Sequence, residues 1–275
     1  MTGDFLVGNR LIYGLRTPDW IGIPYTDIGF ELPYLKFPRF KEPQAGDVII
    51  FKFPRDVHQK YVKRCVAGPG DEIQVRNRDL YVNGTLSPLA KNGKYIGDVY
   101  SEFEVQKEIF LGNQGNKDFF HSLIIPRKGD IINVSPENAI LLLHLMLLDG
   151  HEITLKTRSK TYTFTMVSPA ELARRKGVSA DNKYYPFGNL LNPWSSNFPS
   201  GTLLIDGKPV QEMSEYIVEQ NYFWAMGDNR DDSLDSRFWG FVPESHILGK
   251  ALFAYFSLNL DTWIPRFNRI GTIIN

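Results

Sequence analysis

The hydrophobic and polar positions of this 275-residue chain predict mainly short β-strands separated by turns. Residues 48–53 and 61–66 are rich in β-branched and aromatic side chains, and the short polar link between them predicts an antiparallel pair. An Asn-Gly pair at 83–84 and an Asp-Gly pair at 206–207 follow apolar runs, which is the pattern of two-residue hairpin turns. Residues 161–165 alternate between polar and apolar, as a half-buried strand does.

One continuous apolar run, residues 139–148, predicts a helix instead. Ser135 and Pro136 offer a start, and Gly150 offers a stop. The run is about half of the roughly 20 residues that a bilayer-spanning helix needs. We interpret it as a short buried helix, with contact to a membrane surface as the alternative.

Composition narrows the function classes. Hydrophobic residues make up 43% of the chain, enough for one large core or two smaller ones. Lysine plus arginine and aspartate plus glutamate balance at 31 each, so no basic excess points to a nucleic-acid partner. Cys65 is the single cysteine, which excludes an internal disulfide.

The most concentrated chemistry lies in residues 227–237, here named the charged loop, which hold four aspartates, two arginines and two serines. Apolar residues 222–226 and 238–242 flank it, so we expect it to pack against the core with its charges paired. A calcium loop does not fit, because a ligand set that starts at Asp228 would place Arg230 third and no glycine sixth. A solvated acidic turn remains an alternative at this point.

A second stretch, residues 61–71, reads as a strand that ends in a Pro-Gly turn. On a strand, Tyr61, Lys63 and Cys65 share one face. Beside an aromatic ring and a thiol, desolvation would lower the pKa of the Lys63 amine. The alternative is a strand lysine whose amine extends into solvent.

Together these stretches resemble the bacterial type I signal peptidases, or leader peptidases. Ala-Gly-Asp with the following apolar run at 45–51, Lys-Arg with Gly-Pro-Gly-Asp at 63–71 and the charged loop occur in the order of that family. The resemblance continues through Trp-Gly-Phe-Val-Pro at 239–243 and weaker matches at 263–271. It covers the first and last thirds of the chain closely and the middle loosely.

The resemblance implies a mainly β fold, with an antiparallel β-sheet catalytic core of the signal-peptidase type. Residues 1–90 plus 219–275 would form this core. Residues 91–218, where the composition shifts, would form an inserted second domain that is β-rich with α+β character. Within it we expect a new strand at 124–130, a short helix from 168 and a loop at 184–200.

The resemblance also implies a membrane-associated serine endopeptidase that removes N-terminal signal peptides from exported preproteins with a Ser–Lys dyad, without cofactor or metal. Lys63 matches the general base and Ser233 the residue that orients it. The further residues that it assigns are Asp228, Arg230, Asp235 and Arg237 as structural support and Tyr61 and Val62 as substrate contacts. Peptide substrate would dock along residues 59–63, with residues 5–11 on the other side. Signal peptides and the membrane surface are the implied partners.

The family's serine box, which carries the nucleophile, precedes the segment that matches residues 1–7, and the hydrophobic anchors precede the box. Neither has a counterpart in residues 1–275. We therefore expect these residues by themselves to be inactive, and a catalytically dead relative that retains the fold is the alternative. The implied location is the cell membrane, with the catalytic domain on the extracytoplasmic side. A histidine triad is disfavoured by the contexts of the five histidines, and a self-cleaving repressor by the lack of a DNA-binding segment.

Overall fold

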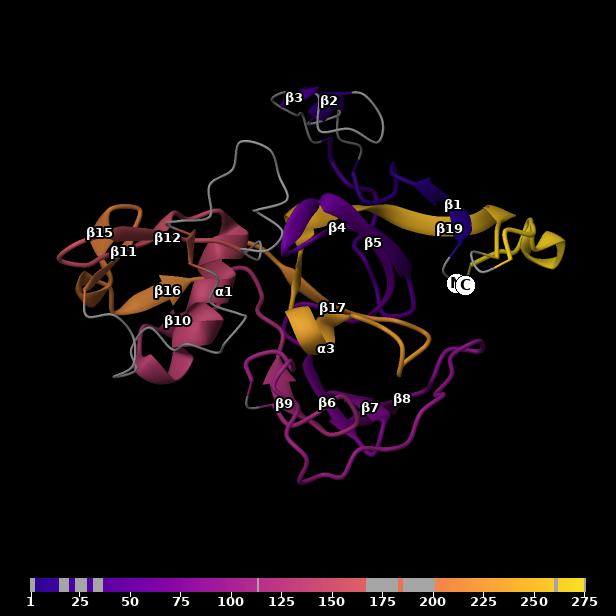
Figure 1. Ribbon diagram of the computed structural model, residues 1–275, viewed down its shortest axis with the longest axis horizontal. Coiled ribbons are helices and arrows are strands. Elements are labelled where there is room, and N and C mark those ends of the chain that lie inside the picture. Colours follow the sequence, from indigo (N-terminus) through magenta and orange to yellow (C-terminus); the bar gives the residue numbers. More distant parts are fainter. Residues whose placement is uncertain are drawn as a thin grey trace.

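The computed structural model describes residues 3–14, 20–22, 29–31, 37–112, 114–166, 183–184, 201–259 and 262–274. Its largest sheet is antiparallel and runs in the order β1-β19-β4-β5-β17-β18 (Figure 1). The six strands are β1 (Asp4–Asn9), β4 (Val48–Phe53), β5 (Asp56–Ala67), β17 (Tyr222–Met226), β18 (Val242–Pro243) and β19 (Ile247–Ser257).

Smaller sheets surround this one. A four-stranded sheet has the order β8-β7-β6-β9, a five-stranded sheet has the order β13-β12-β11-β14-β15, and β10–β16 and β2–β3 are pairs. The strands are β2 (Trp20–Gly22), β3 (Gly29–Glu31), β6 (Glu72–Arg76), β7 (Asp79–Val82), β8 (Thr85–Ser87), β9 (Phe120–Ile124), β10 (Ile131–Asn133), β11 (Ile153–Lys156), β12 (Thr161–Phe164), β13 (Lys183–Tyr184), β14 (Thr202–Ile205), β15 (Lys208–Pro209) and β16 (Glu215–Ile217). The helices are α1 (Ala139–Asp149) and α3 (Ser236–Trp239), with 3₁₀ turns at Pro136–Asn138, Val210–Glu212, Glu244–His246 and Phe267–Arg269. The prediction of a mainly antiparallel β fold is confirmed.

Local sequence signals account for several of these elements. Asn83 and Gly84 have φ angles of 51° and 74°, and Asp206 and Gly207 have φ angles of 49° and 79°. Two successive left-handed residues are what a type I′ hairpin turn requires, and both turns join paired strands. The predicted pairing of residues 48–53 with 61–66 is also confirmed, although the link is shorter than expected because β5 already begins at Asp56.

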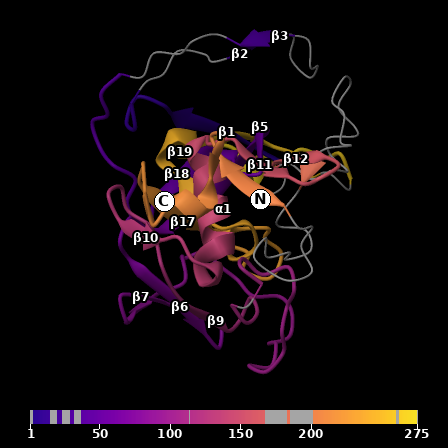
Figure 2. The ribbon, with the colours of Figure 1, turned by 90° about the vertical axis from the view of Figure 1, so that its left-hand side faces the viewer.

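The predicted apolar helix is confirmed as α1. It ends at Gly150, whose φ of 96° satisfies the left-handed C-cap position. Its buried side chains join the larger hydrophobic cluster, which explains why the run has no polar face. In Figures 1 and 2, α1 lies next to β10, on the far side of β17 from β1 and β19. Of the helices in the described ranges, none is both long and apolar enough to cross a membrane.

Strand β17 connects the two hydrophobic clusters of the molecule, because all five of its residues are buried. Tyr222, Trp224 and Met226 face the larger cluster, which contains α1. Phe223 and Ala225 face a smaller cluster with β4 and Trp239. A strand covered on both faces reads as an unbroken apolar run, as residues 222–226 do. The charged loop therefore leaves directly from the centre of the structure.

Some of the other sequence predictions were not confirmed. The strand expected to start at 124–130 is wrong: β9 ends at Ile124, and a turn closed by Asp130 N–H to the Arg127 carbonyl precedes β10. Pro126 has no N–H to continue the ladder. The helix expected from 168 and most of the loop at 184–200 lie outside the described residues. The four-stranded sheet takes strands from both sides of residue 90, and the domain boundaries remain a prediction.

Candidate active site

The structure brings Lys63 of β5 against Ser233 of the charged loop. The Lys63 Nζ donates a 2.7 Å hydrogen bond to Ser233 Oγ. Burial of the amine lowers the pKa of Lys63 from its ordinary value, and the nearby Arg237 guanidinium adds to the effect. Asp235, Asp232 and Asp228 act in the opposite direction without reversing it. The site thus holds an amine with a raised neutral fraction against a hydroxyl group.

Sheet pairing explains how these two residues meet. Strand β5 pairs with β17 only at its end, where Arg64, Cys65 and Ala67 match Met226, Ala225 and Trp224. The charged loop begins at the next residue, Gly227, and so starts beside Lys63.

Gly227 itself must lack a side chain. A Cβ atom there would overlap Ser233 Oγ and lie 2.6 Å from Ser233 Cβ and 3.5 Å from Lys63 Nζ. Gly227 belongs to the sequence motif, but the reason for a glycine there is the close approach of Ser233, which only the fold reveals.

Asp235 and Arg237 form an ion pair beneath the two residues, and both side chains are buried. Arg237 donates 2.9 Å bonds from Nε and Nη2 to the two carboxylate oxygens of Asp235. Its remaining donors reach the carbonyl oxygens of Lys117 at 3.1 Å and Arg230 at 2.5 Å. Asp235 also accepts from the Gly227 N–H at 3.1 Å. Burial alone would raise the pKa of the Asp235 carboxyl, but Arg237 and the Gly227 N–H keep it below its usual value.

The pair lies at the start of helix α3. Asp235 is the N-cap of α3 and accepts from the Arg237 backbone N–H at 3.2 Å. The pair therefore spans the first turn of a helix. An aspartate ahead of Ser-Arg-Phe-Trp is a usable N-cap signal that the sequence interpretation missed.

Asp228 and Arg230, both expected to hold the charged loop together, have different partners. Asp228 pairs through two 2.8 Å bonds with Arg64, so it attaches the loop to β5. Arg230 is buried, with its Nη1 3.6 Å from Met226 Sδ, and burial followed by the nearby Arg237 lowers its pKa. Arg64 follows Lys63 in sequence, yet its role at the site was not anticipated.

The two expected substrate contacts lie on opposite faces of β5. Tyr61 shares the face of Lys63, with the Lys63 Nζ 5.9 Å from its ring centroid, and it stacks on Phe53 at 4.4 Å. Val62 points to the other face and is exposed. Cys65 is fully buried, and burial raises the pKa of its thiol to about 12.

The edge of β5 beside Lys63 is open. Residues 56–64 pair with β4 on one side, whereas the pairing with β17 on the other side starts only at Arg64. No other described strand covers the free edge. An extended peptide could add to it through backbone hydrogen bonds. Strand β1, the other expected docking segment, lies at the far end of the sheet order, with β19 and β4 between it and β5.

The geometry predicts that Asp235 supports the fold. We expect Asp235→Ala to lower the free energy of unfolding by about 3–5 kcal/mol, because it leaves the buried Arg237 charge without its partner. Ser233→Ala removes one partly exposed hydroxyl and is expected to change stability little. Thermal melts of both variants test this, and an Asp235→Ala melting temperature equal to that of the parent protein would contradict it.

Comparison of the sequence with known proteins identifies its family. A family model described as "Signal peptidase, peptidase S26" matches residues 1–256. The signal peptidase I of Buchnera aphidicola from Acyrthosiphon pisum is 27% identical over 99% of this chain and 70% of its own length, and that of Aquifex aeolicus is 24% identical over 96% and 73%. A crystal structure of a signal peptidase I from Enterococcus faecalis V583 is 18% identical over 76% of this chain and 97% of its own, with a TM-score of 0.28. The chain belongs to the signal peptidase family, peptidase S26.

Proposed function

We propose that this protein is a serine endopeptidase that removes N-terminal signal peptides from exported preproteins, with Lys63 as its general base. The observation that carries the proposal is the 2.7 Å hydrogen bond between a desolvated lysine amine and Ser233. A serine hydroxyl attacks a peptide bond only when a base removes its proton, and a neutral lysine can serve in place of histidine. Membership in the signal peptidase family supports the choice of substrate.

The protonation state of Lys63 follows from its surroundings. An ordinary lysine is protonated near neutral pH and cannot accept a proton. Burial lowers the pKa of Lys63, so a larger fraction of the amine is neutral at a given pH. After it takes the proton from the nucleophile, the ammonium can pass it to the leaving amine, as a general base does in acyl transfer. Asp235 favours the transient ammonium electrostatically.

Ser233 is proposed to orient Lys63 and not to attack the substrate. The nucleophile is assigned to the serine box that the family carries ahead of the segment matching residues 1–7. A catalytically dead relative that keeps this fold is the competing interpretation. The protein encoded by the whole gene distinguishes the two, because only the peptidase cleaves a signal-peptide substrate.

The substrate is proposed to bind as an added strand on the free edge of β5 at residues 57–63. Tyr61, held by its stack on Phe53, would line a pocket for a substrate side chain on the face of Lys63. Val62 would contact the substrate from the opposite face, where it is exposed. The family's preference for small side chains before the cleaved bond would require only shallow pockets at this edge.

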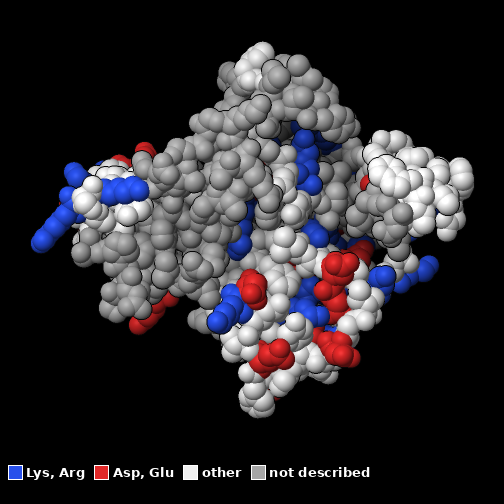
Figure 3. Space-filling model, in the orientation of Figure 1, with Lys and Arg blue, Asp and Glu red and all other residues white. Residues whose placement is uncertain are grey.

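We also propose that the protein contacts the membrane through exposed apolar residues of β1, β19 and residues 262–274. Figure 3 shows an uncharged surface on the right, where these segments lie. The residues of this C-terminal apolar patch are Phe5, Leu252, Phe253, Tyr255, Trp263, Ile264, Phe267, Ile270 and Ile273. Asp4 pairs with Arg269 at 2.6 Å and holds the C-terminal segment against β1. Large exposed apolar patches mark interaction sites, and tryptophan is favoured at membrane interfaces.

Substitution of Lys63 tests the proposed base. In the protein encoded by the whole gene, Lys63→Ala should lower kcat/KM for a signal-peptide substrate by about a hundredfold to ten-thousandfold. Lys63→Arg should fail as well, because a guanidinium does not lose its proton. In the parent protein, kcat/KM should rise with pH through the lowered pKa of Lys63, because the neutral amine is the active form. Lys208→Ala, at an exposed lysine of β15, is the control. Turnover near the parent value in either Lys63 variant would reject the assignment.

Gly227→Ala tests whether close contact in the charged loop is needed for activity. The added methyl group would displace Ser233 and break its hydrogen bond to Lys63. A misplacement of this size costs about a hundredfold in rate. We expect kcat to fall while the protein remains folded by circular dichroism. Gly84→Ala is a control for glycine removal, because a Cβ there meets nothing within 4 Å and its hairpin lies away from Lys63, although its left-handed φ carries some strain. Equal kcat values for Gly227→Ala and the parent protein would show that Ser233 need not occupy this position.

The C-terminal apolar patch is tested by vesicle binding. The double substitution Trp263→Ser and Phe267→Ser should weaken co-sedimentation with anionic phospholipid vesicles by about tenfold or more, because each side chain would bury apolar area in the lipid. Phe103→Ser is the matched control, since Phe103 is 90% exposed but lies between β8 and β9. Unchanged binding by the double variant would rule out this surface as the contact.

A further inference from the structure

We propose that Lys117, in the segment between β8 and β9, is a positioning residue for the Ser233–Lys63 pair and acts by holding the carboxylate of Asp231. Asp231 lies two residues before Ser233 in the charged loop. The proposal rests on the proposed function, which assigns the pair its chemistry. It adds a residue from residues 91–218, which were expected to form an inserted second domain.

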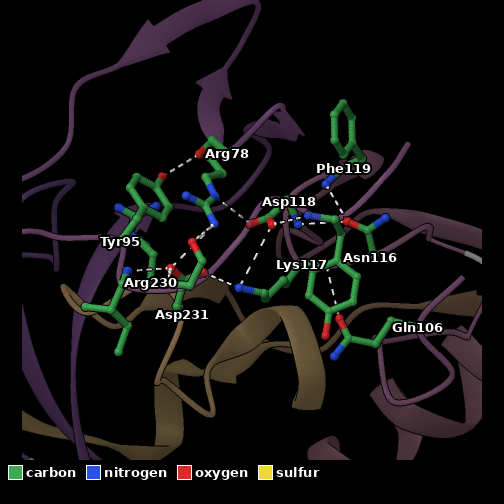
Figure 4. Close-up of polar contacts among 12 residues, drawn as sticks. Arg78, Tyr95, Gln106, Asn116, Lys117, Asp118, Phe119, Arg230 and Asp231 are labelled. Carbon is green, nitrogen blue, oxygen red and sulfur yellow. Dashed lines mark hydrogen bonds and ion pairs between the residues drawn. The ribbon is translucent and has the colours of Figure 1, made fainter. Parts of the chain in front are cut away.

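The Asp231 carboxylate is held by three donors from one segment. Lys117 Nζ forms an ion pair with Oδ1, and the backbone N–H groups of Ile96 and Gly97 donate to Oδ2 at 2.7 and 2.9 Å. The side chains of Asp231 and Lys117 are only 5% and 9% exposed. Figure 4 shows the amine of Lys117 pointing at Asp231. Two successive N–H groups and a cation form a small anion-binding nest that the carboxylate fills.

Arg78 and Asp118 brace this nest (Figure 4). Arg78 donates to the Gly97 carbonyl at 2.7 Å, and its Nη2 is 3.6 Å from Asp231. Asp118 is 3.5 Å from Arg78 Nε and accepts from the Tyr100 N–H at 3.0 Å. Arg78 and Asp118 therefore hold the segment that supplies the donors to Asp231.

The position of Ser233 depends on this contact because its own backbone has few restraints. In the described part of the chain, residues 232–234 make no backbone hydrogen bond. Asp232 and Leu234 are exposed. The nearest fixed points are two carboxylates with several partners each, the half-buried Asp231 before Ser233 and the buried Asp235 after it. Asp235 is attached to α3 and Gly227, whereas the hydrogen bonds and the shortest ion pair of Asp231 come from the segment that carries Lys117, with a longer ion pair to Arg78.

The contact is also stable over the pH range in which a lysine base would work. Burial alone would raise the pKa of Asp231, but Gly97, Lys117 and Ile96 lower it to about 2. The carboxylate is thus ionised throughout neutral pH, and its stabilising contribution is lost only in acid as the pH falls through this value. A hollow of about 610 Å³ lies beside Lys117 and Asp231, so an opened contact would admit water to the charged loop.

The test uses the full-length protein encoded by the gene, with Lys117→Met, Lys117→Arg and Asp231→Asn. Lys107→Met is the matched control, because Lys107 is exposed on the same segment and has no ion-pair partner among the residues described. The first readout is the pH dependence of acylation of the Lys63 amine by an amine-reactive ester, followed by mass spectrometry. The second is kcat and KM for a signal-peptide substrate.

We expect Lys117→Met and Asp231→Asn to shift the midpoint of Lys63 acylation to higher pH, because water would reach the amine. Both should lower kcat about tenfold to a hundredfold with KM within twofold of the parent value. The double variant should lose no more than either single variant, since both break one contact. Lys117→Arg should restore most of kcat, and Lys107→Met should match the parent protein.

An unchanged acylation midpoint and kcat in both single variants would overturn the proposal. A loss of activity that is fully explained by a lower melting temperature would also overturn it, and so would unfolding of both variants. In either case the contact would be purely structural. If the parent protein cleaves normally and Lys117→Met does not shift the midpoint of Lys63 acylation, the positioning role is refuted and the proposed function stands. If the parent protein cleaves no signal-peptide substrate but Lys117→Met still shifts the midpoint of Lys63 acylation, the proposed function is refuted and the positioning role stands.

Discussion

The buried ion pair between Asp235 and Arg237 is the interaction on which the rest of the site depends. Both charges are removed from water, so the net free energy that the pair contributes to folding is modest, whereas the loss of one partner is costly. The pair matters for the site because each of its two groups also binds other parts of the chain. Asp235 fixes the start of α3 and the Gly227 N–H, and Arg237 fixes the carbonyls of Lys117 and Arg230. One pair thus joins the charged loop, α3 and the segment before β9.

This arrangement is possible because the charged loop follows directly after β17, which lies in the middle of the core. Its five residues are buried against a hydrophobic cluster on each face, and Gly227 follows without a side chain. The loop therefore begins in a place from which water is already excluded. The same exclusion desolvates Lys63 on the neighbouring strand, so the hydrophobic core is the direct cause of the lowered pKa of its amine.

The sequence predicted the parts of this structure that depend on local signals. The Asn-Gly and Asp-Gly turns, the β4–β5 pair and the apolar helix were all recognisable from residue type and period. The motif matches placed Lys63 and Ser233 in the same site, and the structure shows them in contact. The N-cap role of Asp235 had a local signal that was overlooked, whereas the partner of Asp228 and the requirement for a glycine at 227 could not be predicted, because each depends on which segment lies opposite. Lys117 is the clearest case, since it is 114 residues from Asp231 in sequence and belongs to no recognisable motif.

The charge pattern of the loop resolves an apparent contradiction at the base. The charged loop holds four aspartates, and carboxylates near Lys63 should raise the pKa of its amine and keep it protonated. Three of them, however, have a cation of their own: Asp228 has Arg64, Asp231 has Lys117 and Asp235 has Arg237. The fourth, Asp232, is exposed, where water screens its field. With the acids neutralised in pairs, desolvation remains the dominant influence on the pKa of Lys63. The loop can therefore hold Lys63 through a hydrogen bond without keeping its amine protonated.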